Sequence, residues 1–396
     1  MKTEVTLHII ANAAFGRGLS GGDRIFIECA KRWAKSGHNL SVYVCEEGYE
    51  MCQRNGLQNV KYVLWPAAFY KNFGFAVFYL SRTVKGIIRA LKMDISKASE
   101  GTVVYSASDF WPDSLPAWIL KIRFRKAKWV ASFNLFAPSP FNDESPYRGR
   151  RKLRGLFYYL SQSPSYALIR RYADMVWVTS EPDRWRFVDS RLLPNSVIAV
   201  RGGVDVKTPA SIPEPAEKRF DVVFIGRFHP QKGVLELIDI WKYVCGRKKD
   251  AKLAMIGVGD LEGEVVRKIR SYGLENNIVL LGFKDGVEKF RIFKDSKVVV
   301  HPATYDSGGM AACEAMACGL PGVSFDLLAL RTYYPKGMLK TPCFDLEAFA
   351  ENILKLLNDE KLYEKTAKAA LDWAQEWDWD KRAEFLLERI SDCLQH

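Results

Sequence analysis

The chain has 396 residues, 48% of them hydrophobic, which is enough for two domains with separate cores. Its longest apolar run, 73–80, is far shorter than the roughly 20 residues that a membrane-spanning helix needs, so we exclude a transmembrane protein. Eight cysteines without a CxxC pair and five scattered histidines argue against a disulfide framework and a metal site, and indicate a reducing compartment. Residues 1–10 alternate like a strand rather than a signal peptide, so we expect a cytoplasmic protein.

The positive charge lies in the first half of the chain. The net charge is +12, but residues 1–205 hold 30 Lys and Arg against 17 Asp and Glu, a net of +13, whereas 206–396 hold 28 against 29, a net of −1. This asymmetry predicts that the first half meets an anionic partner, which is a membrane surface, a nucleic acid or a phosphorylated substrate.

Short apolar segments alternate with amphipathic ones along the chain, the pattern of doubly wound α/β domains. The first helix is predicted at 24–36, and the strands of the first half are predicted at 5–10, 40–44, 102–105, 129–132, 175–179 and 197–200. In the second half, strands are predicted at 221–225, 252–256, 278–281, 298–301 and 322–325.

A proline-containing stretch, 207–218, is interpreted as a linker between two similar domains. The predicted limits are 1–205 for the first domain and 206–376 for the second, with a last helix, 377–396, that packs back onto the first domain. Asp378 and Asp380 form a DxD sequence, which we interpret as a helix cap without a metal role because Asp is favoured at helix starts.

A glycine-rich loop, 16–23, lies between the first strand and the first helix. Gly21 and Gly22 precede the predicted helix start, where backbone N–H groups suit a phosphate. The loop is neither a P-loop nor a GxGxxG sequence, which disfavours an ATPase and a dehydrogenase. A plain crossover loop remains the alternative.

Three strands of the second half also end in glycines. The segment 224–233 places Arg227 and Lys232 just beyond a strand, at the edge where open α/β sheets bind ligands. These two cations would neutralise a diphosphate, although two solvated surface cations remain the alternative. The segments 255–260 and 280–284 carry Gly257 and Phe283, where the backbone is open to a ligand.

The segment 301–322 is the most informative part of the sequence, because it places Asp306 and Glu314 on either side of a Gly-Gly turn. The Ala-rich stretch after the turn is predicted to be helical, with Asp306 or Ser307 as its N-cap and Gly319 just past its end. A helix that starts at such a turn presents free N–H groups to an anion. We therefore predict a phosphate cradle with one carboxylate on each side, suited to a sugar diphosphate.

Together, these motifs in this order resemble the retaining glycosyltransferases of family 4 (glycosyl transferases group 1), which have the GT-B fold. The set comprises Gly21-Gly22, 202–205, Gly226-Arg227 with Lys232-Gly233, 257–259, 281–283 and the Asp306-x7-Glu314 pair. The resemblance covers nearly the whole chain and is most specific in the second half. It implies two Rossmann-like doubly wound domains that face each other across a cleft, the first binding the acceptor and the second the donor.

The resemblance also implies a role for each matched residue. Arg227 and Lys232 would bind the donor diphosphate, Asp306 would meet the donor sugar, and Glu314 would bind the ribose. Asp306 stands where the family usually has Glu, and Asn134 stands where many relatives have a His, in contact with the acceptor. The remaining expected donor contacts are Gly22, Gly226, Gly257, Phe283, Ser307, Gly308, Gly309, Met310 and Ala311.

We therefore expect a hexosyltransferase that moves a sugar from a nucleotide-diphosphate sugar to a hydroxyl group and retains the anomeric configuration. The expected acceptor is a glycolipid, a lipid-linked oligosaccharide or a surface polysaccharide. The motifs require no metal and no cofactor beyond the donor co-substrate. A related GT-B epimerase or phosphorylase, and a non-catalytic sugar-nucleotide-binding protein, remain as alternatives.

Two segments without acidic residues, 114–142 and 145–173, interleave Lys and Arg with aromatic residues. This combination is typical of an interfacial surface, because the charges meet anionic headgroups and the rings lie at the boundary. We expect these segments to place the protein peripherally on the inner face of a membrane, with a solvated charged face as the alternative. Nucleic acid is disfavoured because no known binding module accompanies the charge.

Overall fold

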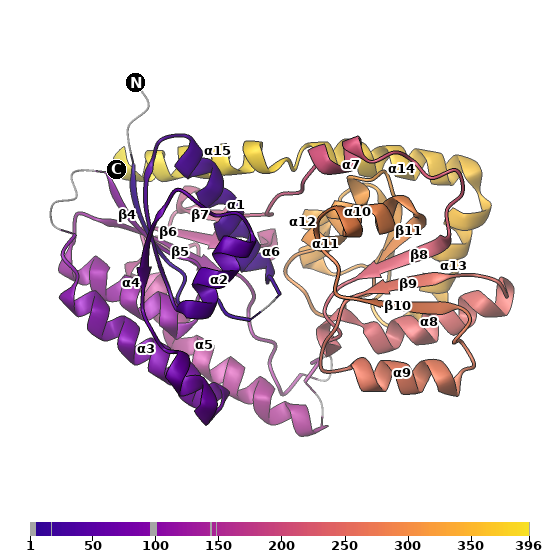
Figure 1. Ribbon diagram of the computed structural model, residues 1–396, viewed down its shortest axis with the longest axis horizontal. Helices are drawn as coiled ribbons and strands as arrows, with labels where there is room; N and C mark the ends of the chain where they lie inside the picture. Colours follow the sequence, from indigo (N-terminus) through magenta and orange to yellow (C-terminus); the bar gives the residue numbers. More distant parts are fainter. Residues whose placement is uncertain (1–4, 17, 96–100, 143–144, 148, 396) are drawn as a thin grey trace. The chain divides into compact units, whose positions relative to one another are not determined.

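The computed structural model describes residues 5–16, 18–95, 101–142, 145–147 and 149–395 (Figure 1). The chain forms two compact units. The first comprises Met1–Ala137, Leu153–Gly202 and Trp379–His396, and the second comprises Pro138–Lys152 and Gly203–Asp378. The segment Pro138–Lys152, which lies inside the predicted first domain, thus belongs to the second unit.

The first unit contains a seven-stranded parallel sheet in the order β3-β2-β1-β4-β5-β6-β7. The strands are β1 (Thr6–Ile10), β2 (Asn39–Val44), β3 (Lys61–Leu64), β4 (Thr102–Ser106), β5 (Lys128–Phe133), β6 (Met175–Val178) and β7 (Val197–Ala199). Six of these strands were predicted, whereas the edge strand β3 was not. The strand order reverses beside β1, and ligands of open α/β sheets bind at such a switch point.

Helices cover both faces of this sheet (Figure 1). They are α1 (Gly21–Lys35), α2 (Glu46–Arg54), η1 (Ala68–Phe73), α3 (Phe75–Lys92), α4 (Trp111–Arg123), α5 (Lys152–Tyr172), α6 (Glu181–Arg184), η3 (Pro194–Ser196) and α15 (Trp379–Gln395). Helix α1 starts at Gly21, earlier than predicted, because the Ser20 hydroxyl and the Asp23 carboxylate form a capping box there. Helix α15 packs on α1, where the Trp33 indole donates a 2.8 Å hydrogen bond to the Ala383 carbonyl.

The second unit contains a six-stranded parallel sheet in the order β10-β9-β8-β11-β12-β13. Its strands are β8 (Phe220–Ile225), β9 (Leu253–Ile256), β10 (Ile278–Gly282), β11 (Ser296–His301), β12 (Gly322–Phe325) and β13 (Met338–Thr341). Its helices are η2 (Gly149–Arg151), α7 (Lys207–Ser211), η4 (Pro230–Lys232), α8 (Val234–Arg247), α9 (Glu262–Ser271), α10 (Gly286–Lys294), α11 (Met310–Met316), α12 (Leu328–Tyr333), α13 (Leu346–Asn358) and α14 (Glu360–Gln375). The sequence did not predict β13, and the expected linker is partly helical because it contains α7.

The core of the second unit has two layers, one on each face of its sheet. Val222 and Phe224 of β8 point to the layer covered by α8, α9 and α13, whereas Val223 points to the layer covered by α10, α11 and α14. Successive side chains of a strand alternate between faces, and both faces of a parallel sheet are buried, so these strands read as continuous apolar runs. No helix within the described parts of the chain is long and apolar enough to cross a membrane.

Candidate functional site

Three glycine-bearing loops meet at the carboxyl edge of the second sheet, after β8, β9 and β10 (Figure 1). The Gly257 amide donates to the Gly282 carbonyl at 2.8 Å, and the Phe228 amide donates to the Val258 carbonyl at 3.0 Å. Gly257 has φ of 144°, and a Cβ there would lie 1.9 Å from the Gly226 carbonyl oxygen, so only glycine fits. The structure therefore brings together Gly226, Gly257 and the loop that carries Phe283, whose side chain is 57% exposed.

Lys232 ends η4 and lies over the loop that follows β11. Gly233 joins η4 to α8 with φ of 62°, and a Cβ there would lie 1.9 Å from the Pro302 carbonyl oxygen. The Thr304 amide donates to the Gln231 carbonyl at 3.0 Å, which ties the two loops together. This arrangement brings the Lys232 ammonium into an ion pair with Asp306. Arg227, in the loop between β8 and η4, is exposed.

Asp306 is a buried carboxylate with several donors around it. Its Oδ2 contacts the Lys232 ammonium and lies 3.2 Å from His301 Nε2, and its Oδ1 accepts the amides of Ser307 and Gly308 at 3.0 and 3.3 Å. Burial alone would raise the pKa of Asp306, but the Lys232 charge and the His301 contact hold this pKa well below its usual range. Burial lowers the pKa of His301, which favours the neutral imidazole. Asp306 is therefore held as an anion.

The predicted cap of α11 is wrong. The N-cap is Gly309, not Asp306 or Ser307. The Asp306 side chain instead accepts the amides of Ser307 and Gly308, in the loop before the helix begins. Those two amides therefore already have an acceptor. Gly319 lies beyond the helix with φ of 81°, as expected for a residue that follows a helix end.

The remaining residues of the predicted cradle pack against two tyrosines. The Tyr334 hydroxyl donates to the Gly309 carbonyl, and a Cβ on Gly308 would lie 2.9 Å from the Tyr333 hydroxyl. Met310 and Ala311 form the first turn of α11, where amides have no acceptor within the helix.

Glu314 is buried on α11 and pairs with a lysine that the sequence analysis missed. Lys289 of α10, which is 2% exposed, places its Nζ 2.9 Å from Glu314 Oε2 and 2.8 Å from Asp285 Oδ1. Asp285 also accepts the Gly286 amide at the start of α10. A buried lysine gives no separate signal in the sequence, because most lysines are exposed and the residue type alone does not show its burial.

The segment Pro138–Lys152 contributes residues to this edge of the second unit that the sequence analysis did not assign to it. Arg151 forms a 2.7 Å ion pair with Glu264 of α9, and the Tyr147 ring lies 5.9 Å from the His229 ring. Burial raises the pKa of Tyr147, and the nearby Arg227 charge opposes that shift. Tyr147 thus lies close to one of the two cations predicted to bind the diphosphate.

The first unit brings Gly22 and Asn134 together. A Cβ on Gly22 would lie 2.3 Å from Asn134 Nδ2, so α1 approaches the end of β5 closely only with glycine at this position. Asn134 is also held by its carbonyl, which accepts the Thr179 hydroxyl at 2.5 Å. Arg17 of the glycine-rich loop lies outside the described residues. Gly22 and Asn134 therefore lie in contact within this unit, and their role in acceptor binding stays a prediction.

The described residues contain no cluster of three His, Cys, Asp or Glu side chains that could hold a metal ion. Helix α15 starts at Trp379, so Asp378 directly precedes it, and Asp380 forms a 2.6 Å ion pair with Arg32.

Two buried carboxylates follow β4 in the first unit. Burial raises the pKa of Asp109 to about 6 and that of Asp113 to about 7. The carboxylate of Asp113 accepts the Ala13 amide at 2.7 Å and the Ser108 hydroxyl at 2.5 Å. A carboxyl with a raised pKa in the folded state stabilises the fold at low pH and loses this contribution as the pH rises through the folded pKa.

We expect the variant Asp113→Asn to gain stability relative to the wild type as the pH rises from 5 to 8. Its amide keeps a carbonyl acceptor for the Ala13 N–H but does not ionise, whereas Asp113 in the wild type ionises near pH 7. The difference in unfolding free energy between the variant and the wild type should change by up to about 1.4 kcal/mol per pH unit. Thermal unfolding midpoints of both proteins at pH 5, 6, 7 and 8 measure it. A constant difference between the two unfolding midpoints from pH 5 to pH 8 would contradict a raised pKa at Asp113.

Comparison with known proteins finds a family match in the second unit. Residues 208–373 match the model of the family described as glycosyl transferases group 1. The phosphatidyl-myo-inositol mannosyltransferase of Mycobacterium leprae is 30% identical over 205 residues, which are 50% of this chain and 53% of that protein. The amylovoran biosynthesis glycosyltransferase AmsD of Erwinia amylovora is 27% identical over 45% of this chain and 49% of its own. The chain thus aligns with about half the length of these curated relatives.

Solved structures match over nearly the whole chain. Anabaena HepE, solved in complex with UDP-glucose, has a TM-score of 0.72 at 17% identity and covers 98% of this chain and 100% of its own. Staphylococcus aureus TarM has a TM-score of 0.71 at 12% identity, with 98% and 100% coverage. These likenesses, with the two parallel sheets, confirm the predicted GT-B fold, and the family match confirms the predicted resemblance. Residues 208–373 are therefore similar to the glycosyl transferases group 1, in a chain with the GT-B fold.

Proposed function

We propose that this protein is a retaining glycosyltransferase that moves a hexosyl group from a nucleotide-diphosphate sugar to a hydroxyl group. The observation that carries the proposal is the buried Asp306 anion paired with Lys232, at the glycine loops of the family-matched segment. The printed names of the relatives support it, since one is a mannosyltransferase and a structural neighbour was solved with UDP-glucose.

Lys232 and Arg227 would bind the donor diphosphate and stabilise the charge that develops as the sugar leaves. Lys232 has three N–H donors, and its contact with Asp306 uses one of them, so a phosphate oxygen is compatible with the same ammonium group. Arg227 is exposed and would add a two-pronged contact to the phosphates. The positive charge would therefore be in place before the donor arrives.

Asp306 and Glu314 would orient the two ends of the donor. Asp306 would accept hydroxyl groups of the sugar, and being one methylene shorter than Glu it would favour a different sugar or sugar position than a relative with Glu. Glu314 would accept ribose hydroxyls, as the family resemblance implies, while Lys289 holds its carboxylate in place. The amides of Met310 and Ala311 remain the proposed helix contacts of the diphosphate.

The acceptor would bind the first unit beside Gly22 and Asn134. An asparagine hydrogen-bonds a sugar but does not act as a base, so the leaving phosphate is proposed to take the acceptor proton, as the family resemblance implies. A glycolipid, a lipid-linked oligosaccharide or a surface polysaccharide is the proposed acceptor. The relatives named for phosphatidyl-myo-inositol and for amylovoran biosynthesis support these classes. The net charge of +13 in residues 1–205 supports an anionic membrane surface as a further partner.

We expect one class of nucleotide-diphosphate sugar to raise the thermal unfolding midpoint. A ligand that binds only the folded state stabilises it by about 2.7 kcal/mol at 100 times its Kd. UDP-, GDP-, ADP- and dTDP-sugars are screened with the wild type and with Arg227→Ala, which should lose most of the shift. A screen in which no member shifts the midpoint would contradict the proposal.

Incubation of the donor found by this screen then separates the alternatives. A transferase releases the nucleoside diphosphate and moves the sugar to an added acceptor, whereas an epimerase changes the sugar without an acceptor. A phosphorylase would require inorganic phosphate, and a binding protein would leave the donor intact.

A further inference from the structure

A strongly basic stretch of the first unit lies outside the segments 114–142 and 145–173. Residues 51–93 contain no acidic residue and seven basic ones, which are Arg54, Lys61, Lys71, Arg82, Lys85, Arg89 and Lys92. This stretch forms β3, η1 and α3.

Helix α3 buries one side and leaves an apolar row exposed on the other. Its buried residues, among them Phe78, Arg82 and Gly86, lie on the side that packs on α4. The exposed row is spaced by three and four residues, which keeps it on one side of the helix, and its members are 42% to 54% exposed. The row consists of Val77, Leu80, Val84, Ile88 and Leu91.

The row continues beyond the helix start into η1. Phe69, Phe73 and Phe75 are 69%, 59% and 59% exposed. Exposed aromatic side chains next to an exposed aliphatic row form an apolar patch of the kind that marks a binding surface. We call the row and these three phenylalanines the α3 face.

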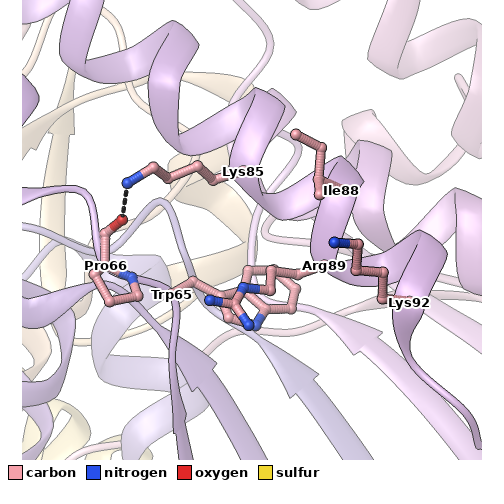
Figure 2. Close-up of a pocket in the computed structure, with 6 residues that line it drawn as sticks. All are labelled: Trp65, Pro66, Lys85, Ile88, Arg89 and Lys92. Atoms are coloured by element: carbon pink, nitrogen blue, oxygen red, sulfur yellow. Dashed lines mark hydrogen bonds between the residues drawn. The ribbon is translucent and has the colours of Figure 1, made fainter.

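A basic pocket adjoins the α3 face. Figure 2 shows its lining, in which Lys85, Arg89 and Lys92 extend from α3 beside Trp65 and Pro66, and Ile88 belongs to both the pocket and the row. Its volume is about 360 Å³, and none of its lining residues is acidic. The Lys85 ammonium donates to the Pro66 carbonyl at 2.5 Å. Three cations and an indole around one pocket suit a phosphate group with an organic substituent.

The two basic and aromatic segments singled out in the sequence contain both buried and exposed side chains. Trp129 is fully buried, and the Trp118 ring lies 6.0 Å from the Tyr172 ring, within the packing between α4 and α5. Other side chains of those segments are exposed: Phe141 at 73%, Leu153 at 76%, Phe157 at 56%, Tyr159 at 40% and Leu160 at 59%. Arg148 and the side chains of Arg150 and Arg154 lie outside the described residues.

We propose that the α3 face lies on an anionic membrane, with its apolar row at the headgroup boundary and a phospholipid phosphate in the Trp65 pocket. An exposed apolar row flanked by cations is the arrangement by which amphipathic helices bind such surfaces. The inference rests on the membrane partner proposed above, but it is independent of the donor chemistry of the second unit.

Charge favours a membrane over a second copy of the chain. Two acids of α2 lie beside this surface, since Glu47 pairs with Lys71 at 2.6 Å and Glu46 interacts with Lys85. A symmetric contact between two α3 faces would still bring together two copies of Arg89 and Lys92, in a pocket lining without an acidic residue. Like charges facing each other oppose association, whereas anionic headgroups attract them.

Sedimentation of the full chain with vesicles tests the inference. The wild type should bind phosphatidylglycerol–phosphatidylcholine vesicles at low salt, leave them at high salt, and bind pure phosphatidylcholine weakly. Arg89→Gln/Lys92→Gln should weaken binding about 30-fold, since each basic residue near the surface contributes about 1 kcal/mol. Val84→Ser/Ile88→Ser/Leu91→Ser, which changes no charge, should weaken it at least about tenfold.

The matched control removes the same two charges from α14. Lys365→Gln/Lys368→Gln, at two exposed positions of the second unit, should bind like the wild type. Equal losses in both double variants would overturn the α3 site and leave only a net-charge effect. Release of the wild type by millimolar inorganic phosphate at constant ionic strength would overturn it in favour of a free-phosphate site.

Two further measurements keep this inference distinct from the proposed function. Sedimentation velocity should give the same mass for the wild type and the α3 variants, and a dimer lost in those variants would overturn the membrane in favour of a second copy. Donor-induced thermal shifts should be unchanged in the α3 variants. Normal vesicle binding without any donor shift would therefore defeat the proposed transferase while supporting the α3 face.

Discussion

Replacement of Lys232 with alanine is expected to lower kcat about 10²- to 10³-fold, the usual cost of removing one group that stabilises charge in the transition state. In the proposed reaction, the Lys232 ammonium would neutralise the departing diphosphate. The same change leaves the Asp306 carboxylate, with 11% side-chain exposure, without its cationic partner, so the midpoint of thermal unfolding should also fall. Transfer or hydrolysis of the donor found by thermal shift gives kcat.

Three variants separate chemistry from folding. Lys268→Ala breaks a lysine–carboxylate pair of similar exposure, with Asp239 at 2.5 Å, and should leave kcat unchanged. Lys232→Arg keeps the charge and should recover part of the rate and most of the stability. Arg227→Ala should reduce transfer without lowering the unfolding midpoint, because its side chain is exposed. A Lys232→Ala enzyme with a normal kcat would show that the predicted donor site is wrong.

The interior of the fold could be predicted from the sequence because burial on both faces leaves a simple pattern. Strands such as β4 and β9 are buried throughout and mostly apolar, since helices cover both sides of a parallel sheet. The edge strands β3 and β13 were missed because they are short and partly exposed, and each contains a lysine. Their pairing with β2 and β12, rather than their own composition, makes them strands.

The loops of the candidate site could be located but their contacts could not. Gly226, Gly257 and Gly233 mark positions where backbones approach closely, and glycine is itself the signal for such an approach. The partners of Asp306 were not predictable from the sequence. An Asp that caps a helix and an Asp that accepts the next two amides of the loop before the helix have the same sequence pattern. Lys232 contacts Asp306 only after β8 and β11 pair side by side, whereas the His301 contact depends on the fold of the loop that joins it to Asp306.

The charge pattern locates the basic half of the chain, and a membrane partner for that half stays a prediction. The segments 114–142 and 145–173 combine basic and aromatic residues, yet Trp129 and Trp118 pack inside the unit. The stretch 51–93 also holds basic residues without an acid, but in the sequence its apolar residues look like a core-facing helix stripe. Helix α3 in fact has two apolar sides, and only the described structure distinguishes the side that packs on α4 from the exposed one.

Replacement of Lys289 with methionine is expected to destabilise the second unit by about 3–5 kcal/mol, the cost of breaking a buried ion pair by removing one partner. Methionine has a similar length, so little cavity forms. The variant leaves the Glu314 carboxylate, with 5% side-chain exposure, facing an apolar side chain in place of the ammonium at 2.9 Å. Urea unfolding of the wild type and the variant measures the loss.

A second substitution separates the buried charge from packing. Lys289→Met/Glu314→Gln removes both charges, so it should recover most of the stability, because a neutral pair of similar volume is tolerated where a lone buried ion is not. The same double variant should bind the donor weakly, since the proposed ribose contact is lost.

The control Lys284→Met breaks an exposed pair with Glu288 at 2.5 Å and should cost less than about 1 kcal/mol. If Lys289→Met cost no more than this control, Lys289 would not hold Glu314 in place. If the double variant stayed as unstable as Lys289→Met, the loss would lie in packing around α10 rather than in the charge on Glu314.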